Sequence, residues 1–303
     1  MKKHFRKERS GPLLIILAGI FWGSMGIFVR RLTEYGFTSF QIVAIRLTLA
    51  AVCFWLIQLI ADRPGCRIHR QSIPLFLGLG LMSILFFTVC YFTAITQMSL
   101  STAAILLYTS PIWVMLMSVL FLHESLTSKK LLALAFAFAG CVLVSGFSGG
   151  GLSASGLLLG LGSGIGYGLY SILGTIALRR HSPWTVTTWT FTIAAIGSLL
   201  ICRPADLLAK ISLAPSVPVL LLLCLLTSVI TAVIPFLLYT LGLRHVEAGR
   251  AAILATVEPL VATVFGFLLF SEPVSLSSAL GILLILSAVI ILNLRKKELH
   301  HEN

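Results

Sequence analysis

The chain is short of charged residues. Only 11% of its 303 residues are Asp, Glu, Lys or Arg, whereas 58% are hydrophobic, and the mean hydropathy is +1.02. Soluble domains carry about 25% charged residues, so this composition excludes an ordinary soluble protein. The apolar runs are long and do not alternate with polar residues, which excludes a membrane β-barrel.

Patterns for metal, disulfide and nucleotide chemistry are also missing. The six cysteines are scattered without paired spacing and are interpreted as apolar filler. All seven histidines lie at chain ends or in predicted loops. Neither a phosphate-binding loop nor a dinucleotide fingerprint is present. The sequence therefore predicts no metal site and no cofactor, and it disfavours a membrane-embedded enzyme, which needs a convergent catalytic cluster.

Long apolar runs dominate what remains. A helix needs about 20 apolar residues to cross a bilayer. The runs that meet this need cover residues 12–32, 38–60, 73–95, 101–122, 130–147, 155–178, 184–202, 217–242, 250–270 and 275–294. The predicted fold class is an all-α membrane protein with ten transmembrane helices, the first of them uncleaved.

The net charge of +12 is explained by topology rather than by nucleic acid. If the N-terminus is cytoplasmic, the inner segments hold 17 of the 22 Lys and Arg residues, in the N-terminus and in 62–70, 129–130, 179–180, 244–250 and 295–297. The outer loops hold only Arg30, Arg31, Arg203 and Lys210. This bias predicts a multi-pass protein of the cell membrane with both termini in the cytoplasm.

One pattern occurs twice at an offset of 148 residues. Ala103-Ala104-Ile105-Leu106, Ser110-Pro111 and Glu124 recur as Ala251-Ala252-Ile253-Leu254, Glu258-Pro259 and Glu272, and Tyr91 corresponds to Tyr239. A duplication of this length indicates two related halves. The predicted organisation is a basic N-terminus (1–11), a first repeat (12–147), a Gly/Ser link (148–154), a second repeat (155–294) and a C-terminus (295–303).

The repeats are predicted to be inverted. Each holds five spans, and an odd number places two related halves in opposite orientations. Lys129-Lys130 in the first repeat become Ser277-Ser278 in the second, as expected if one connection is inside and the other outside. Inverted repeats recur in secondary transporters, with the substrate site near the midplane.

The duplicated pattern resembles the EamA-type proteins of the drug/metabolite transporter superfamily. Phe21-Trp22-Gly23 and Arg46 are also similar to that family, and the resemblance covers residues 12 to 294. It implies a ten-helix carrier of small metabolites, often an exporter of amino acids or related compounds, with a central cavity between inverted bundles. In the second repeat, Tyr167 occupies the position that corresponds to Trp22. This departure from the family pattern leaves the shape of the cavity at that point undetermined.

Two charged residues lie inside predicted spans. Arg46 there is costly, by about 2.5 kcal/mol or more, unless it faces protein or water. It either binds an anionic substrate group or Glu258, or anchors to helix-end carbonyls. Glu258 precedes Pro259, and burial disfavours its charged form. It either exchanges a proton or binds a substrate amine, or it bonds a carbonyl freed by the proline.

Aromatic and small residues complete the candidates. Packing or a membrane-interface position is an alternative reading for each aromatic residue. The predicted substrate-binding residues are Trp22, Arg46, Tyr91, Tyr108, Tyr167, Tyr239 and Glu258. Structural or gating roles are predicted for Pro111, Glu124, Pro235, Pro259, Glu272, Gly160 and Gly164; the two glycines belong to a seam of small residues for close helix packing.

The sequence thus predicts a secondary transporter, an exporter of small metabolites such as amino acids, working by alternating access. A channel or facilitator for small solutes is the main alternative, and an enzyme is disfavoured. The expected partners are a small-molecule substrate and the lipid bilayer, with proton coupling open at Glu258. Substrate identity, transport direction, coupling ion and oligomeric state are left undetermined.

Overall fold

The computed structural model describes residues 2–98, 100–146, 153–202, 204–271 and 275–293. Within these ranges the chain is helical, and ten helical segments are long and apolar enough to span a membrane. This confirms the predicted all-α membrane fold. The predicted link (148–154) lies mostly outside the described residues, and the predicted C-terminus (295–303) lies outside them entirely.

Several spans are built from more than one helical piece. The first five are α1 (Lys2–Gly23) with α2 (Met25–Glu34); α3 (Ser39–Ala61); α4 (Ile73–Leu77) with the π-helix η3 (Gly78–Leu85) and α5 (Phe86–Ala94); α6 (Leu100–Leu107) with α7 (Ser110–Leu122); and α8 (Ser128–Ser145). The second five are α9 (Ala154–Ala177); α10 (Pro183–Ile201); α12 (Val217–Ser228) with the π-helix η4 (Val229–Val233) and α13 (Ile234–Leu243); α14 (Ala248–Ala255) with α15 (Val257–Phe270); and α16 (Leu276–Asn293). The connections contain η1 (Arg63–Cys66), η2 (Arg70–Ser72) and α11 (Pro204–Ser212).

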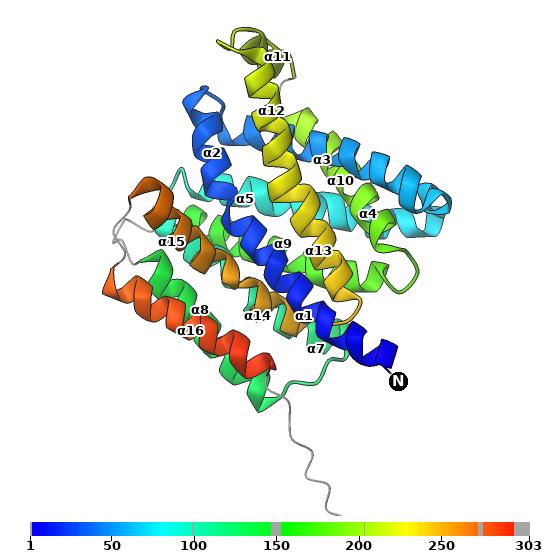
Figure 1. The fold of residues 1–303 in the computed structure, drawn as a ribbon, viewed down its shortest axis with the longest axis vertical. Coiled ribbons are helices and arrows are strands. Elements are labelled where there is room, and N and C mark those ends of the chain that lie inside the picture. Colours follow the sequence, from blue (N-terminus) through cyan, green and yellow to red (C-terminus); the bar gives the residue numbers. More distant parts are fainter. Residues whose placement is uncertain (1, 99, 147–152, 203, 272–274, 294–303) are drawn as a thin grey trace, which may run out of the picture.

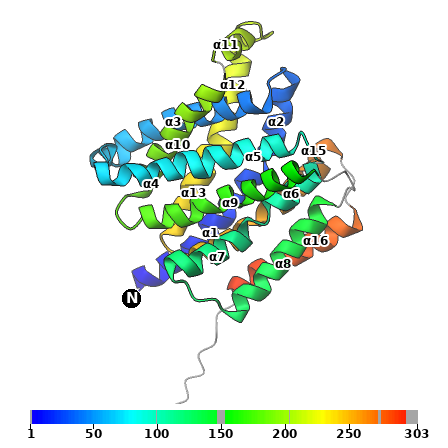
Figure 2. The same ribbon diagram turned by 180° about the vertical axis from the view of Figure 1, so that it is seen from behind.

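The helices form one bundle whose outer faces are apolar. Side chains such as Ile60 (88% exposed) and Leu200 (84% exposed) point away from the protein. Exposed apolar surface on this scale is expected where lipid rather than water is the solvent. α8 and α16 pack together at one edge, α3 and α10 at another, and α1, α7, α9, α13 and α14 lie between them (Figures 1 and 2).

The helix that carries Arg46 is held firmly against α10. The Phe54 and Phe191 rings lie 5.0 Å apart between α3 and α10. At the end of α3, the Ser182 hydroxyl donates to Asp62, and the Gly65 amide adds a second bond. These bonds, the Ser182 bond first, hold the pKa of the Asp62 carboxyl below its usual range. The cluster fixes the end of α3 and therefore the position of Arg46 along the bundle.

Structural breaks recur at the repeat offset. α6 ends at Leu107 and α14 at Ala255, 148 residues apart, and each is followed by a new helix whose first turn contains a proline, Pro111 or Pro259. α7 and α15 also end alike, because His123 and Ser271 both adopt the left-handed conformation, with φ of 57° and 53°. Proline has no backbone N–H, and the N–H groups at the start of a helix have no partner within the helix, so a proline there costs no hydrogen bond. The duplicated motif therefore encodes a span broken near its middle.

The π-helices occupy matching positions as well. Residues 81–85 of η3 correspond to residues 229–233 of η4 at the same offset. Pro235, for which a structural or gating role is predicted, lies just after η4. Its repeat counterpart is Phe87, however, so proline is not the shared cause. π-segments are frequent at functional sites, and Ser83 and Ile84 of η3 line a small pocket described below.

The glycine seam faces the broken spans. A Cβ atom at Gly160 would lie within 3.1 Å of three Leu106 side-chain atoms, and one at Gly164 would lie 2.8 Å from the Leu106 carbonyl oxygen. In α1, a Cβ at Gly23 would lie 2.7 Å from the Glu258 carbonyl oxygen. Small residues thus let α9 and α1 approach the breaks at α6 and α14 closely, as bilayer helices do.

The two broken spans meet at only one end. α7 of the first repeat packs against α14 of the second. The equivalent pair, α15 of the second repeat and α6 of the first, has no comparable packing among the described residues. The α7–α14 contact lies at the face where α1 begins, which we call the N-terminal face. The bundle is therefore closed near this face and separated near the opposite one.

Candidate functional site

A cavity of about 360 Å³ lies beside the helix breaks. It is lined by Trp22, Gly23, Met25, Gly26, Val29, Ser39, Arg46, Phe87, Thr88, Tyr91, Phe92, Ile95, Leu107, Tyr108, Tyr167, Phe236, Glu258 and Ala262. Most of this lining is apolar or aromatic. Arg46 and Glu258 are the charged residues of the lining, so the cavity presents one basic and one acidic side chain within a mainly hydrophobic wall.

Arg46 has no hydrogen-bonded carboxylate among the described residues, although Glu258 lies near enough to interact with its charge. The residue is only 4% exposed, and its Nη1 lies 3.0 Å from the Met25 Sδ. Nε is buried and has no hydrogen-bond partner among the described residues. No ion pair with a described carboxylate is present. The alternative, anchoring to helix-end carbonyls, is not found within the described part of the chain either. A buried guanidinium with a thioether as its partner has spare donors for an anionic ligand.

Glu258 is oriented by a phenol. It lies in the first turn of α15, and its Oε2 accepts a hydrogen bond of 3.0 Å from the Tyr167 hydroxyl. The alternative bond from a protonated Glu258 to a carbonyl freed by Pro259 stays a prediction. Tyr167 itself packs against Phe87 and Trp22, with ring centroids 5.3 and 6.1 Å apart. The carboxyl group is thus held at the cavity wall.

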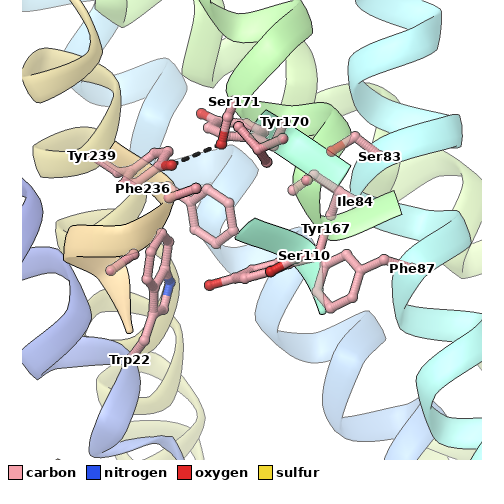
Figure 3. Close-up of a pocket in the computed structure, with 14 residues that line it drawn as sticks. Trp22, Ser83, Ile84, Phe87, Ser110, Tyr167, Tyr170, Ser171, Phe236 and Tyr239 are labelled. Atoms are coloured by element: carbon pink, nitrogen blue, oxygen red, sulfur yellow. Dashed lines mark hydrogen bonds between the residues drawn. The ribbon is translucent and has the colours of Figure 1, made fainter. Parts of the chain in front are cut away.

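Four aromatic residues separate the cavity from a smaller pocket. Trp22, Phe87, Tyr167 and Phe236 line both spaces, and the rings of Trp22 and Phe236 lie 5.0 Å apart. We call these four residues the aromatic layer. Figure 3 shows its rings gathered between the helices. The cavity therefore ends at a wall of side chains rather than continuing through the protein.

The smaller pocket is enclosed on the side of the N-terminal face. Its volume is about 20 Å³, room for about one water molecule. Ser83, Ser110, Ser171 and Tyr239 give it hydroxyl groups (Figure 3). Ala252 brings α14 to its wall. The Tyr239 and Ser171 hydroxyls are hydrogen-bonded at 2.7 Å. The pocket is therefore a small, mainly apolar space with a few hydroxyl groups in its wall.

A second cavity continues the first toward the opposite face. It measures about 310 Å³ and shares Gly23, Gly26, Tyr108 and Ala262 with the first. Its remaining lining includes Arg30, Ser145 and Phe270, near the ends of α2, α8 and α15. The space lies where α6 and α15 fail to meet. The two cavities together form a cleft that runs from the aromatic layer toward the opposite face.

The structure brings together most of the predicted substrate-binding residues. Trp22, Arg46, Tyr91, Tyr108, Tyr167 and Glu258 all line the larger cavity. Tyr239 is different, because it lies beyond the aromatic layer and is 4% exposed. The repeat-related Tyr91 and Tyr239 thus border different spaces, and the pair does not line one cavity together.

The predicted structural residues lie at the breaks and helix contacts. Pro111 and Pro259 begin the half-helices α7 and α15, and Pro235 begins α13 after η4. Glu124 follows α7 and contacts α14. Glu272 lies outside the described residues.

Sequence reasoning missed several lining residues. Phe87, Phe236 and Met25 line the cavity without a charge or motif that distinguishes them from other apolar residues. Phe236 directly follows Pro235, and this position beside a helix break was the one feature of the sequence that could have identified it as a lining residue. No group of three or more His, Cys, Asp or Glu side chains able to hold a metal occurs in the described part of the chain.

The family model of the EamA-like transporters matches the chain twice, over residues 9–146 and 154–294. The chain belongs to the EamA-like transporter family. It is therefore a multi-pass membrane transporter, and the predicted resemblance is confirmed. Proteins of this family are transporters rather than enzymes.

Relatives of known sequence agree with this assignment, and a solved structure agrees with the fold. The chain is 32% identical to an uncharacterized transporter of Archaeoglobus fulgidus over 95% of this chain and 97% of that protein. It is 28% identical to the pseudopaline exporter CntI of Pseudomonas aeruginosa, over 63% of this chain and 66% of that protein. A solved crystal structure superposes with a TM-score of 0.78 at 18% identity, covering 94% of this chain and 96% of the other, which supports the fold.

Proposed function

We propose that this EamA-family protein is a secondary transporter of the cell membrane that exports small zwitterionic metabolites by alternating access. Amino acids and related amino-carboxylate compounds are the substrate class. The observation that carries the proposal is that two charged groups line the same aromatic cavity. One is the buried guanidinium of Arg46, whose Nε has no hydrogen-bond partner, and the other is the Glu258 carboxyl group, which the Tyr167 hydroxyl holds in place.

The chemistry of the cavity supports a zwitterion. The free donors of Arg46 match a substrate carboxylate, because guanidinium and carboxylate bind through two parallel hydrogen bonds. Glu258 would accept from the substrate amino group, and the surrounding rings would cover the apolar part. About 360 Å³ falls within the range of about 300–1,000 Å³ typical of small-molecule sites.

Alternating access is supported by the asymmetry of the broken spans. The cleft is open toward one face and ends at the aromatic layer, beyond which α7 and α14 are packed together. The two repeats, 12–147 and 155–294, are taken to be inverted, so exchanging their arrangements would close the open face and open the closed one. The charge bias assigns the N-terminal face to the cytoplasm, so this conformation faces outward.

Export is the favoured direction. CntI is named an exporter of pseudopaline, and its relation to this chain supports outward movement of an organic solute. Glu258 is the residue on which proton coupling would depend, because it is the acidic residue at the cavity. A channel is the weaker candidate, since a channel has a continuous path in its open state and the cleft stops at a wall.

A binding panel tests the substrate class. Purified protein is heated with leucine, phenylalanine and methionine, and with the N-acetyl and carboxamide derivatives of each. We expect some intact zwitterions to raise the melting temperature, and both derivatives of the same compound to lose most of that effect. Derivatives that stabilise as well as their parents would overturn the proposed role of the two charged residues.

A further inference from the structure

The closed face is held by a contact between the two repeats. Glu124 follows α7 in the first repeat, and its carboxylate accepts hydrogen bonds from the backbone amides of Ala248 (2.6 Å) and Gly249 (3.2 Å). These amides begin α14 in the second repeat. The first amides of a helix lack partners inside the helix. Glu124 supplies them from the other half of the protein.

A lysine strengthens the same contact. Lys130 of α8 lies 2.6 Å from the Glu247 carboxylate and 3.8 Å from that of Glu124. It also donates to the Ser125 carbonyl oxygen at 2.8 Å. The Lys130 side chain is 8% exposed and the Glu124 side chain 9%, so these two are shielded from solvent, whereas the Glu247 side chain is 50% exposed. The Lys130–Glu247 ion pair joins the repeats a second time.

The backbone is shaped for this approach. A Cβ atom on Gly249 would lie 3.1 Å from the Met115 Sδ, 3.2 Å from the Glu124 Oε2 and 3.3 Å from the Ser118 Oγ. Glycine at this position lets α14 come close to α7. Glu247 precedes α14 but makes no side-chain capping bond to it, so the cap on this helix comes from Glu124.

We propose that Glu124, supported by Lys130, is the latch that keeps the cytoplasmic face closed while the cleft faces outward. This inference rests on the proposed alternating-access function. Opening must separate α7 from α14, which frees the amides of α14, the carboxylate and the ammonium group. Each can then bond to water, so a polar latch can be exchanged for hydration at a modest net cost, unlike buried apolar packing. Behind it, the enclosed pocket between α7 and α14 is the passage that would widen.

Cysteine labelling measures the latch without substrate. Ser110 lines the enclosed pocket and is 4% exposed. Ser110→Cys is introduced into a chain without native cysteines and labelled with an impermeant thiol reagent in inside-out vesicles. Glu124→Gln keeps the side-chain shape but removes the charge and one acceptor. We expect it to raise the labelling rate at least about tenfold. Gly249→Ala should act in the same direction.

Glu34→Gln is the matched control, because Glu34 is an exposed acid whose ion pair with Arg31 lies within one helix. We expect it to leave the labelling rate unchanged. An unchanged rate in both Glu124→Gln and Gly249→Ala, or an equal increase in Glu34→Gln, would overturn the latch. If Glu124→Gln does not fold, Gly249→Ala decides the result alone. Transport failure with normal labelling effects would refute the proposed function and leave the latch standing.

Discussion

Arg46→Gln separates binding from folding, because the two effects should have opposite signs. The guanidinium lies within α3, is 4% exposed, and has the Met25 thioether as its side-chain partner. Burying a guanidinium without a carboxylate at ion-pair distance costs free energy. Gln removes that charge while keeping a polar side chain at the cavity. The variant should therefore be at least as stable as the native protein and still lose affinity for the substrate.

The expected loss can be worked from the missing contact. A hydrogen bond to a charged group contributes about 1.5–3 kcal/mol, and about 1.4 kcal/mol corresponds to a tenfold change in affinity. Removing the Arg46 contact to a substrate carboxylate should therefore weaken binding by roughly 10- to 150-fold. The melting temperature without substrate should stay equal or rise, since the burial cost of about 2.5 kcal/mol or more is relieved.

Calorimetric titration and thermal unfolding of the same purified variant measure both quantities. Arg31→Gln is the control, because Arg31 is 62% exposed and pairs with Glu34 away from the cavity wall. It should change neither quantity. If Arg46→Gln binds the substrate as the native protein does, the guanidinium makes no substrate contact. If it unfolds at a much lower temperature, Arg46 is a structural residue, and the assignment is refuted.

Three further predictions concern packing, topology and coupling. Gly164→Ala should lower the folded yield and the melting temperature, because its Cβ would lie 2.8 Å from a backbone oxygen. Gly162→Ala in the same helix is the control and should have a mild effect, because its Cβ would meet its nearest atom at 3.5 Å. Equal tolerance of the two substitutions would refute the packing role of the glycine seam. A cysteine at the exposed Ser153 should react with an impermeant reagent outside the cell, and one at Ser128 should not; the reverse pattern would invert the assigned topology. Glu258→Gln should retain substrate-for-substrate exchange and lose accumulation driven by a pH gradient, and unchanged accumulation would exclude proton coupling at this residue.

The sequence was sufficient for the number and position of the spans. Span length and hydropathy follow from the thickness of the bilayer, so the apolar runs located the helices within a few residues. The charged cavity residues were also predictable, because Arg46 and Glu258 are rare residue types inside a span. Membrane burial makes such exceptions easy to see.

The arrangement at the centre could not be predicted in the same way. The breaks before Pro111 and Pro259 interrupt spans whose hydropathy is continuous, and the π-segment in the first repeat has no proline to signal it. Tyr239 was expected in the cavity because Tyr91 matches it at the repeat offset. The two halves are packed differently at the two faces, so equivalent positions border an open space and a closed one. The hydrogen bond between Glu124 and Ala248 joins residues 124 positions apart. A local sequence pattern cannot predict a contact over that separation.

Counterflow in proteoliposomes tests the central claim most directly. Vesicles loaded with an unlabelled zwitterion identified in the binding panel are diluted into a trace of the labelled compound. A carrier that alternates between two faces should accumulate label transiently, with saturation, and Arg46→Gln should reduce that accumulation at low substrate concentration. Label that only equilibrates across the membrane, without overshoot or saturation, would show a channel and would contradict alternating access.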